Sequence, residues 1–339
     1  MKFLIAGLGS IGRRHLRNLL ALGESDVLLY RTHLGTLPDD ELAGLPVETH
    51  LETALAHHPQ AAIIANPTAL HLDVAIPAAR AGCHLLLEKP VANNLERVEE
   101  LRQAVAQGSG KTLVGFQFRF HPGLVKINQL LQEAAIGRPL SARAHWGEYL
   151  PGWHPWEDYR QGYSARADLG GGVVLTLCHP LDYLRWLLGE VSALWAFTAQ
   201  ISDLELGAEQ GRTRSVVPVE DTAEIGLRFE SGALGSVHLD YSQRPPAHRL
   251  EIVGTQGTIR WDNTDGTVHL YRAGVDHWER FAVPDGFERN HLFLAQMRHF
   301  IDIVNDRAEP LCTLEDGLQA LKLALAAHES QQQHRMIVM

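Results

Sequence analysis

The sequence predicts an α/β fold, in which a doubly wound parallel sheet is followed by an α+β domain with an open, mainly antiparallel sheet. Two observations predict it. Short apolar segments alternate with segments of helical periodicity through the first 120 residues, as in a parallel sheet with crossover helices. Beyond residue 120, most apolar segments are separated by short turns, which only antiparallel neighbours allow.

The elements expected in residues 1–120 take turns along the chain. Apolar runs predict strands, because a parallel strand is covered on both faces: Lys2–Ala6, Val27–Tyr30, Ala61–Ala65, His84–Glu88 and Thr112–Phe116. Helical patterns separate these strands: Ile11–Leu22, Leu51–His57, Leu70–Ala81 and a helix capped by Asn94 that runs to Gln107. Thr49 and Glu52 predict a capping box before the second helix.

Residues 121–339 are expected to form the second domain. Predicted helices cover Gly123–Ala134, Val173–Leu188, Glu288–Asn305 and Leu314–Ser330. Predicted strands form an open meander: Leu140–Tyr149, Val191–Ala199, Ala223–Phe229, Leu234–Tyr241, Arg249–Gly254, Thr258–Trp261 and Val268–Tyr271. Such a sheet favours a homodimer or homotetramer.

Composition excludes several classes of protein. The 339 residues carry a net charge of −10, so neither nucleic acid nor an anionic membrane is expected as a partner; a small molecule is. The three cysteines form no CxxC pair, which indicates a reducing compartment. No segment has the length of a membrane span and the N-terminal apolar run is too short for a signal peptide, so we expect a cytoplasmic protein.

The histidines do not predict a metal site. There are 19 of them, but His57 and His58 are adjacent, His291 and His299 are eight apart, and no H-E-x-x-H occurs. We therefore expect no metal.

A glycine motif follows the first predicted strand. Gly7, Gly9 and Gly12 form G-x-G-x-x-G, with Ser10 and Ile11 between the last two glycines. Placed between a strand and a helix, this motif predicts a dinucleotide site of the Rossmann type, since backbone amides at the helix start can hold a pyrophosphate.

The end of the second strand bears on which dinucleotide binds. A site for NAD usually has an acidic residue there, which accepts from the ribose hydroxyl. This chain has Arg31 and Thr32 instead. An arginine can hold a 2′-phosphate, so NADP is favoured over NAD.

Distinctive residues follow the later strands, at the edge where doubly wound sheets bind ligands. Asn66, Pro67, Thr68 and His71 follow one strand, Glu88-Lys89-Pro90 follows the next, and Gln117, Arg119 and His121 follow the last. Asp168 to Asp182 then contain three successive glycines, Thr176 and His179. In this order, along nearly the whole chain, these motifs resemble the Gfo/Idh/MocA oxidoreductase family, the glucose–fructose oxidoreductase and inositol dehydrogenase types.

The resemblance implies a nicotinamide-dependent oxidoreductase that acts on CH–OH groups. It places Lys89 between nicotinamide and substrate, where it hydrogen-bonds the reacting hydroxyl and shares in proton transfer. His179 matches the family's histidine and Asp182 the acid that follows it. Thr176 stands where many members carry a catalytic Asp, so we expect Lys89 and His179 to carry the chemistry, with Thr176 as an orienting group at most.

Three tryptophans and three tyrosines fall between Trp146 and Tyr163, and the stretch Tyr149–Arg160 within this region is loop-like. Aromatic faces stack on sugar rings, and neighbouring arginines can bind hydroxyls or a carboxylate. With Arg119, the candidates for substrate contact here are Trp153, Trp156, Tyr159, Arg160, Tyr163 and Arg166, with Asp158 and His154 beside them. A hydrophobic cluster under a long loop, or a subunit contact, remains the alternative.

Taken together, these residues predict an NAD(P)-dependent oxidoreductase acting on a sugar, a cyclitol or a related polyhydroxylated small molecule. The alternative is a nucleotide-binding sensor of the same fold without turnover, which Thr176 supports. A third possibility is reduction of a non-sugar carbonyl or imine at the same cofactor site.

Overall fold

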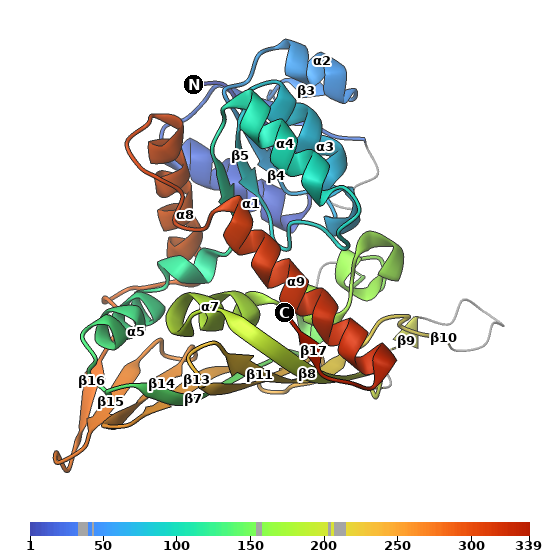
Figure 1. Cartoon of the computed structure of the whole chain (residues 1–339). Coiled ribbons are helices and arrows are strands. Elements are labelled where there is room, and N and C mark those ends of the chain that lie inside the picture. The colour runs from blue at the N-terminus through green and yellow to red at the C-terminus, as the bar shows by residue number, and fades with distance from the viewer. Residues whose placement is uncertain (33–39, 43, 154–157, 203–204, 207–214) are drawn as a thin grey trace. The chain divides into compact units, whose positions relative to one another are not determined.

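The computed structural model describes residues 1–32, 40–42, 44–153, 158–202, 205–206 and 215–339 (Figure 1). The chain forms two compact units. The first contains residues 1–117 and 288–318, and the second contains residues 118–287 and 319–339. No helix among the described residues is long and apolar enough to cross a membrane.

The first unit is built on a six-stranded parallel sheet in the order β3-β2-β1-β4-β5-β6. Its strands are β1 (Phe3–Ala6), β2 (Val27–Tyr30), β3 (Val47–Glu48), β4 (Ala61–Ile64), β5 (His84–Leu87) and β6 (Thr112–Val114). The helices between them are α1 (Ser10–Ala21), α2 (Leu51–Ala56), α3 (His71–Arg80) and α4 (Val98–Gly108). Every residue of β1 and β4 is buried, which confirms the doubly wound sheet expected from their apolar sequences.

Two predicted helix caps are wrong. His50, and not Thr49, precedes the first turn of α2, and it makes no side-chain cap. Arg97 precedes α4, because Asn94 instead accepts a hydrogen bond from the backbone of Glu96 and closes a turn before the helix.

Helix α8 (Arg289–Val304) packs in the first unit, whereas the sequence placed all of residues 121–339 in the second domain. The reason is its apolar face. Phe300 lies edge-on to Phe3 of β1 with 6.5 Å between ring centroids. The rings of Phe293 and His15 of α1 also lie edge-on, with centroids 6.3 Å apart.

The second unit contains a nine-stranded sheet in the order β16-β15-β14-β13-β7-β12-β11-β8-β17. Its strands are β7 (Pro139–Gly147), β8 (Val191–Ala199), β11 (Thr222–Phe229), β12 (Leu234–Asp240), β13 (Ala247–Gly254), β14 (Gly257–Asp262), β15 (Val268–Arg272), β16 (Trp278–Phe281) and β17 (Ile337–Val338). A separate pair joins β9 (Glu205–Leu206) and β10 (Ser215–Val216). Helix α9 (Leu314–Gln333) begins in the first unit and ends in the second.

This sheet is mainly antiparallel, as expected, but it is not a simple meander. Strand β7 lies between β13 and β12, and it pairs with β12 in parallel. A parallel pair cannot be joined by a tight turn, so the signal for this pairing is not local in the sequence.

Helices α5 (Pro122–Gln132) and α7 (His179–Leu188) cover one face of the sheet (Figure 1). Along β11, buried residues alternate strictly with more exposed ones, so one face packs on the core. In the described part of the second unit, no helix lies on the opposite face (Figure 1).

The single helix predicted over Val173–Leu188 is divided into α6 (Val173–Thr176) and α7. Pro180 explains the division. It lacks the N–H that would bond to the carbonyl of Thr176, and its ring would clash with that carbonyl, so a new helix starts around it.

Candidate active site

The glycine turn between β1 and α1 has the shape that a dinucleotide needs. Gly7 has φ +89°, and a Cβ there would lie 2.4 Å from the backbone nitrogen of Asn66. A Cβ on Gly12 would lie 1.9 Å from the carbonyl oxygen of Gly7. A Cβ on Gly9, by contrast, would meet no described atom within 4 Å. Gly7 and Gly12 are therefore needed for packing, and Gly9 leaves open space in front of the helix.

The start of α1 is suited to binding an anion. Its N-cap residue is Gly9, which has no side chain with which to cap the first amides of the helix. No acidic residue lies in that turn. A helix start of this kind attracts phosphate oxygens, so the residues present fit a dinucleotide.

Arg31 and Thr32 follow β2 directly, as the sequence predicted. The backbone N–H of Arg31 donates to the carbonyl of Glu48 in β3, at 3.1 Å, which fixes where the side chain leaves the sheet. The side chain of Arg31 is half-buried and that of Thr32 is exposed.

The turn after β4 is tied to the turn after β5 by one histidine. The ring nitrogens of His71 lie 3.0 Å from the carbonyl oxygen of Asn66 and 2.9 Å from that of Pro90. Burial lowers the pKa of His71. Asn66 and Pro67 remain half-buried while Thr68 is buried, so this turn offers Asn66 rather than Thr68 to a ligand.

Glu88 is a buried anchor for Lys89. His15 of α1 lies 2.8 Å from one Glu88 oxygen, and the backbone N–H of Lys89 donates to the other, at 3.2 Å. Burial by itself would raise the pKa of Glu88, but the hydrogen bond and charge of His15, together with Lys89, outweigh it and lower the pKa. The carboxylate is therefore ionised, and it fixes the start of the Lys89-Pro90 turn.

Lys89 itself is half-buried, at the carboxyl end of β5. That is the edge at which the glycine turn also lies, because β1 and β5 are parallel strands of one sheet. Gln117, at the end of the segment after β6, is buried. The predicted cofactor residues thus belong to one unit and to one edge of its sheet.

The three glycines before α6 have strict local roles. Gly170 and Gly172 have φ of +81° and +111°, and a Cβ on Gly172 would lie 2.5 Å from the Glu220 carboxylate. Glu220 accepts from the backbone N–H of Val174 at 3.1 Å, close to the helix start. The glycines therefore allow Glu220 to cap α6, the helix that ends at Thr176.

Thr176 and His179 are both buried, on either side of the break between α6 and α7. Phe118 lies edge-on to the His179 ring, with centroids 5.0 Å apart, and Trp146 lies 5.3 Å away. His179 belongs to the second unit and Lys89 to the first, so their joint action on one substrate stays a prediction.

Arg119 and Asp182 form a buried ion pair. The Arg119 Nη2 atom lies 2.6 Å from Asp182 Oδ1 and Nε lies 3.1 Å from Oδ2, and the two side chains are 2% and 1% exposed. Asp182 is one turn beyond His179 in α7, so the pair ties the segment before α5 to that helix. The predicted contact of Arg119 with substrate stays a prediction.

In the aromatic loop, the arginines have partners within the loop. The guanidinium of Arg160 forms two hydrogen bonds with Asp158, and that of Arg166 forms two with Asp168. Trp153 lies edge-on to Tyr241 at 5.6 Å. Tyr159 and Tyr163 are half-buried, and Trp156 and His154 lie outside the described residues. A substrate role for this loop stays a prediction.

Sequence reasoning missed His15 and His248. His248 stacks on Trp146, with centroids 4.3 Å apart and an angle of 4°, and it lies 3.3 Å from the Tyr183 hydroxyl. His15 was hidden in the helix after the glycine motif, where its spacing gives no sign of the distant Glu88. The signal for His248 would have been its place two residues before Leu250, on the side of β13 that is buried.

His121 is buried, and it caps α5 with its side chain. Its Nδ1 atom accepts a hydrogen bond from the backbone N–H of Gly123, at 3.0 Å, so protonation of this nitrogen would remove the cap. Burial lowers the pKa of His121 to about 4, against 6.5 for an ordinary histidine. The folded protein therefore holds this ring neutral at a pH where the unfolded chain protonates it.

Replacing His121 with asparagine is expected to make the protein less sensitive to acid. Between pH 6.5 and pH 4 the unfolded wild type gains a proton that the folded state lacks, so its free energy of unfolding falls, by about 3 kcal/mol at the lower limit. Asparagine keeps a cap acceptor and does not titrate. Denaturant unfolding of both proteins at pH 7, 5.5 and 4.5 tests this. If the difference in unfolding free energy between wild type and His121→Asn is the same at all three pH values, the prediction is wrong.

Comparisons with known proteins agree with this geometry. A model of the oxidoreductase family with an NAD-binding Rossmann fold matches residues 1–116, and a model of the GFO/IDH/MocA C-terminal domain matches residues 124–260. Myo-inositol 2-dehydrogenase of Thermotoga maritima is 28% identical, over 99% of this chain and 98% of its own length. Levoglucosan dehydrogenase of Pseudarthrobacter phenanthrenivorans is 32% identical, over 58% of this chain and 53% of its own length.

Solved structures show the same fold. A levoglucosan dehydrogenase in complex with NADH and levoglucosan superposes with a TM-score of 0.86 at 20% identity, over 100% of this chain and 99% of that one. The WlbA dehydrogenase of Bordetella pertussis, in complex with NADH and UDP-GlcNAcA, superposes with a TM-score of 0.80 at 24% identity, over 100% of this chain and 98% of its own. The two family models lie in chain order on the two halves expected of such a protein, and the chain therefore belongs to the Gfo/Idh/MocA family of NAD-binding oxidoreductases.

Proposed function

We propose that this protein is an NAD(P)-dependent dehydrogenase that interconverts a secondary alcohol and a ketone on a cyclitol, a sugar or a related polyhydroxylated small molecule. The observation that carries the proposal is Lys89, which a buried and ionised Glu88 anchors at the sheet edge shared with the open glycine turn. The similarity to myo-inositol 2-dehydrogenase, which extends over 99% of the chain, supports the substrate class.

The roles of the residues follow from the chemistry of alcohol oxidation. A bound nicotinamide supplies the acceptor for the hydride, which leaves carbon with both electrons of its C–H bond. The hydroxyl proton has to leave as well, and the amine of Lys89 would bind that hydroxyl and take the proton. We assign His179 as a second hydrogen-bonding group for the substrate and Thr176 as an orienting group at most.

The experiment is a screen of the purified protein with inositols, aldoses, anhydrosugars and sugar acids, each with NAD⁺ and with NADP⁺. We expect formation of reduced nicotinamide, seen by its absorbance, with at least one polyol. Nucleotide binding without turnover across the whole panel would overturn the enzyme proposal in favour of the sensor alternative. The comparisons give that alternative no support, because the relatives named above are dehydrogenases.

Within this function we propose that NADP(H) is preferred to NAD(H). The support is Arg31 at the tip of β2, where NAD enzymes usually carry an acid. Replacing Arg31 with alanine should raise KM for NADP⁺ about tenfold or more and leave KM for NAD⁺ little changed, because a charge-assisted phosphate contact is lost. Arg80→Ala, on the exposed side of α3, is the matched control. An unchanged KM for NADP⁺ in the Arg31 variant would defeat this preference.

A further inference from the structure

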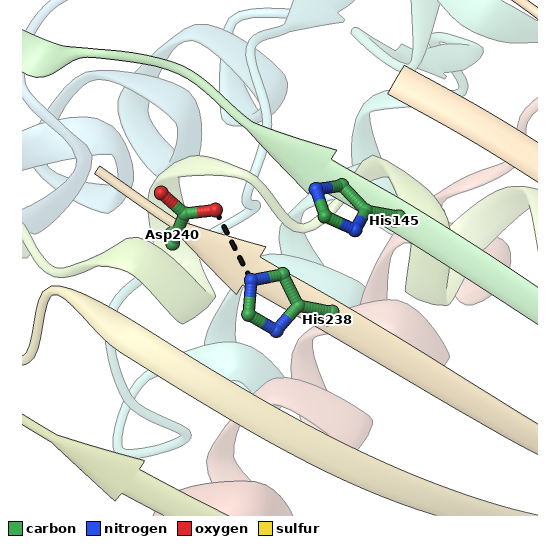
Figure 2. A group of neighbouring side chains, drawn as sticks. All are labelled: His145, His238 and Asp240. Carbon is green, nitrogen blue, oxygen red and sulfur yellow. Dashed lines mark hydrogen bonds and ion pairs between the residues drawn. The ribbon is translucent and has the colours of Figure 1, made fainter. Parts of the chain in front are cut away.

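Three potential metal ligands from two strands meet on the sheet of the second unit, and one of them is far from the other two in the sequence. His145 of β7 and His238 of β12 are register partners in the parallel pair, and Asp240 is two residues beyond His238 (Figure 2). Since side chains alternate along a strand, all three project from one face. Trp146 and Leu239, their neighbours along the strands, are buried in the core on the other face.

The geometry suits one cation. The imidazole rings have centroids 4.6 Å apart at an angle of 36°, and the three ligand atoms lie within 4.8 Å of one another. The Nε2 atom of His238 lies 3.1 Å from Asp240 Oδ2, as the dashed line in Figure 2 marks. The Nε2 atom of His145 is buried and has no hydrogen-bond partner among the described residues.

Two of the three ligands are oriented by hydrogen bonds to neighbouring groups, as is usual for metal ligands. Glu224 of β11 lies 2.6 Å from His238 Nδ1, the nitrogen turned away from Asp240. The other Asp240 oxygen accepts from the backbone N–H of Ser242 at 2.7 Å. A carboxylate behind a ligating histidine fixes its tautomer and its orientation, and such outer partners tune the affinity of metal sites.

We propose that His145, His238 and Asp240 form a binding site for a divalent transition-metal ion, with Zn²⁺ as the ion that this donor set fits best. Two imidazoles and one carboxylate are ligands of borderline softness, which favours zinc over magnesium or calcium. Three protein ligands leave a further position open, and the side chain of His238 is 28% exposed, so an ion can reach the site.

None of the residues of this proposed site has a role in the oxidoreductase chemistry proposed above. The sequence-based expectation of no metal considered only spacings along the chain, whereas His145 and His238 lie on neighbouring strands whose pairing is not local. The competing arrangement is an ion pair. The hydrogen bonds of His238 to Asp240 and Glu224 raise its pKa to about 9. Without a metal ion, a protonated His238 therefore forms an ion pair with Asp240.

The test is zinc binding by the full chain after chelator treatment and desalting. Titration of Zn²⁺ against a chromophoric competitor should give one tight site per chain, and Co²⁺ should give visible absorption bands. Single variants His145→Gln and Asp240→Asn should each weaken zinc binding at least tenfold, because each removes a ligand. His57→Gln is the control, since His57 pairs with Glu48 in the first unit and belongs to no group of three ligands in the part of the chain that the structure describes.

The outcomes separate the two arrangements. Thermal unfolding of each metal-free variant first checks that it is folded, and zinc should raise the midpoint of the wild type but not that of Asp240→Asn. If the wild type binds zinc no more tightly than the His145 and Asp240 variants, the cluster is an ion pair only and the proposal is wrong. Equal weakening in the His57 variant would likewise overturn it, by showing binding spread over the histidines of the surface.

Discussion

Replacing Lys89 with methionine is expected to abolish most of the turnover while nucleotide binding persists. Methionine keeps much of the chain length but cannot take the hydroxyl proton, and positioned acid–base groups contribute about 10²- to 10⁴-fold to rate. The amides of the glycine turn are untouched, so the dissociation constant of the nucleotide should change little. Steady-state kcat on the best substrate of the screen, with nucleotide binding followed by fluorescence, measures both quantities.

Lys111→Met is the matched control for this prediction. Lys111 belongs to the same unit and pairs only at the surface, 3.1 Å from Asp306 and 3.0 Å from Glu309. Its loss should leave kcat unchanged. A Lys89 variant with wild-type kcat would exclude the acid–base role. Loss of nucleotide binding together with kcat would instead make Lys89 a binding residue.

The nucleotide-binding half of the molecule was readable from the sequence because its signals are local. The turn at Gly7, the buried strand before it and the helix after it are each marked by residues within a short segment of the chain: the glycines, the apolar run of β1 and the lack of an acidic residue in the first turn of α1. The anchor of Lys89 was not readable in this way. His15 reaches Glu88 only because β1 and β4, then β4 and β5, pair in parallel, and that order depends on the whole sheet.

The second unit shows the same limit more strongly. Strand-like runs joined by turn residues located β11 and β12 to within one residue at each end, but they gave no sign that β7 lies between β12 and β13. That insertion places His145 beside His238. The break at Pro180 was visible in the sequence, yet the continuous apolar pattern over 173–188 favoured one helix. The same apolar residues are buried in two short helices, and Pro180 is the reason that the chain forms two helices and not one.

Replacing Arg119 with leucine is expected to lower the free energy of unfolding by about 3–5 kcal/mol. The change leaves the Asp182 carboxylate buried without its bidentate cation, and an uncompensated buried charge is costly. Urea unfolding, followed by tryptophan fluorescence, measures the loss. Arg166→Leu is the control, because its pair with Asp168 is 44% and 63% exposed and solvent-exposed ion pairs contribute little to stability.

A double variant, Arg119→Leu with Asp182→Leu, separates charge burial from packing. If the cost of the single change comes from the stranded carboxylate, removing that carboxylate as well should recover most of the lost stability, since apolar pairs often replace buried ion pairs without loss. If the double variant is as unstable as Arg119→Leu, the loss comes instead from the contacts of the Arg119 side chain, such as its packing over Trp186. In the recovered protein, low turnover would then show that the pair holds α7 and His179 in place, a role that stability alone does not reveal.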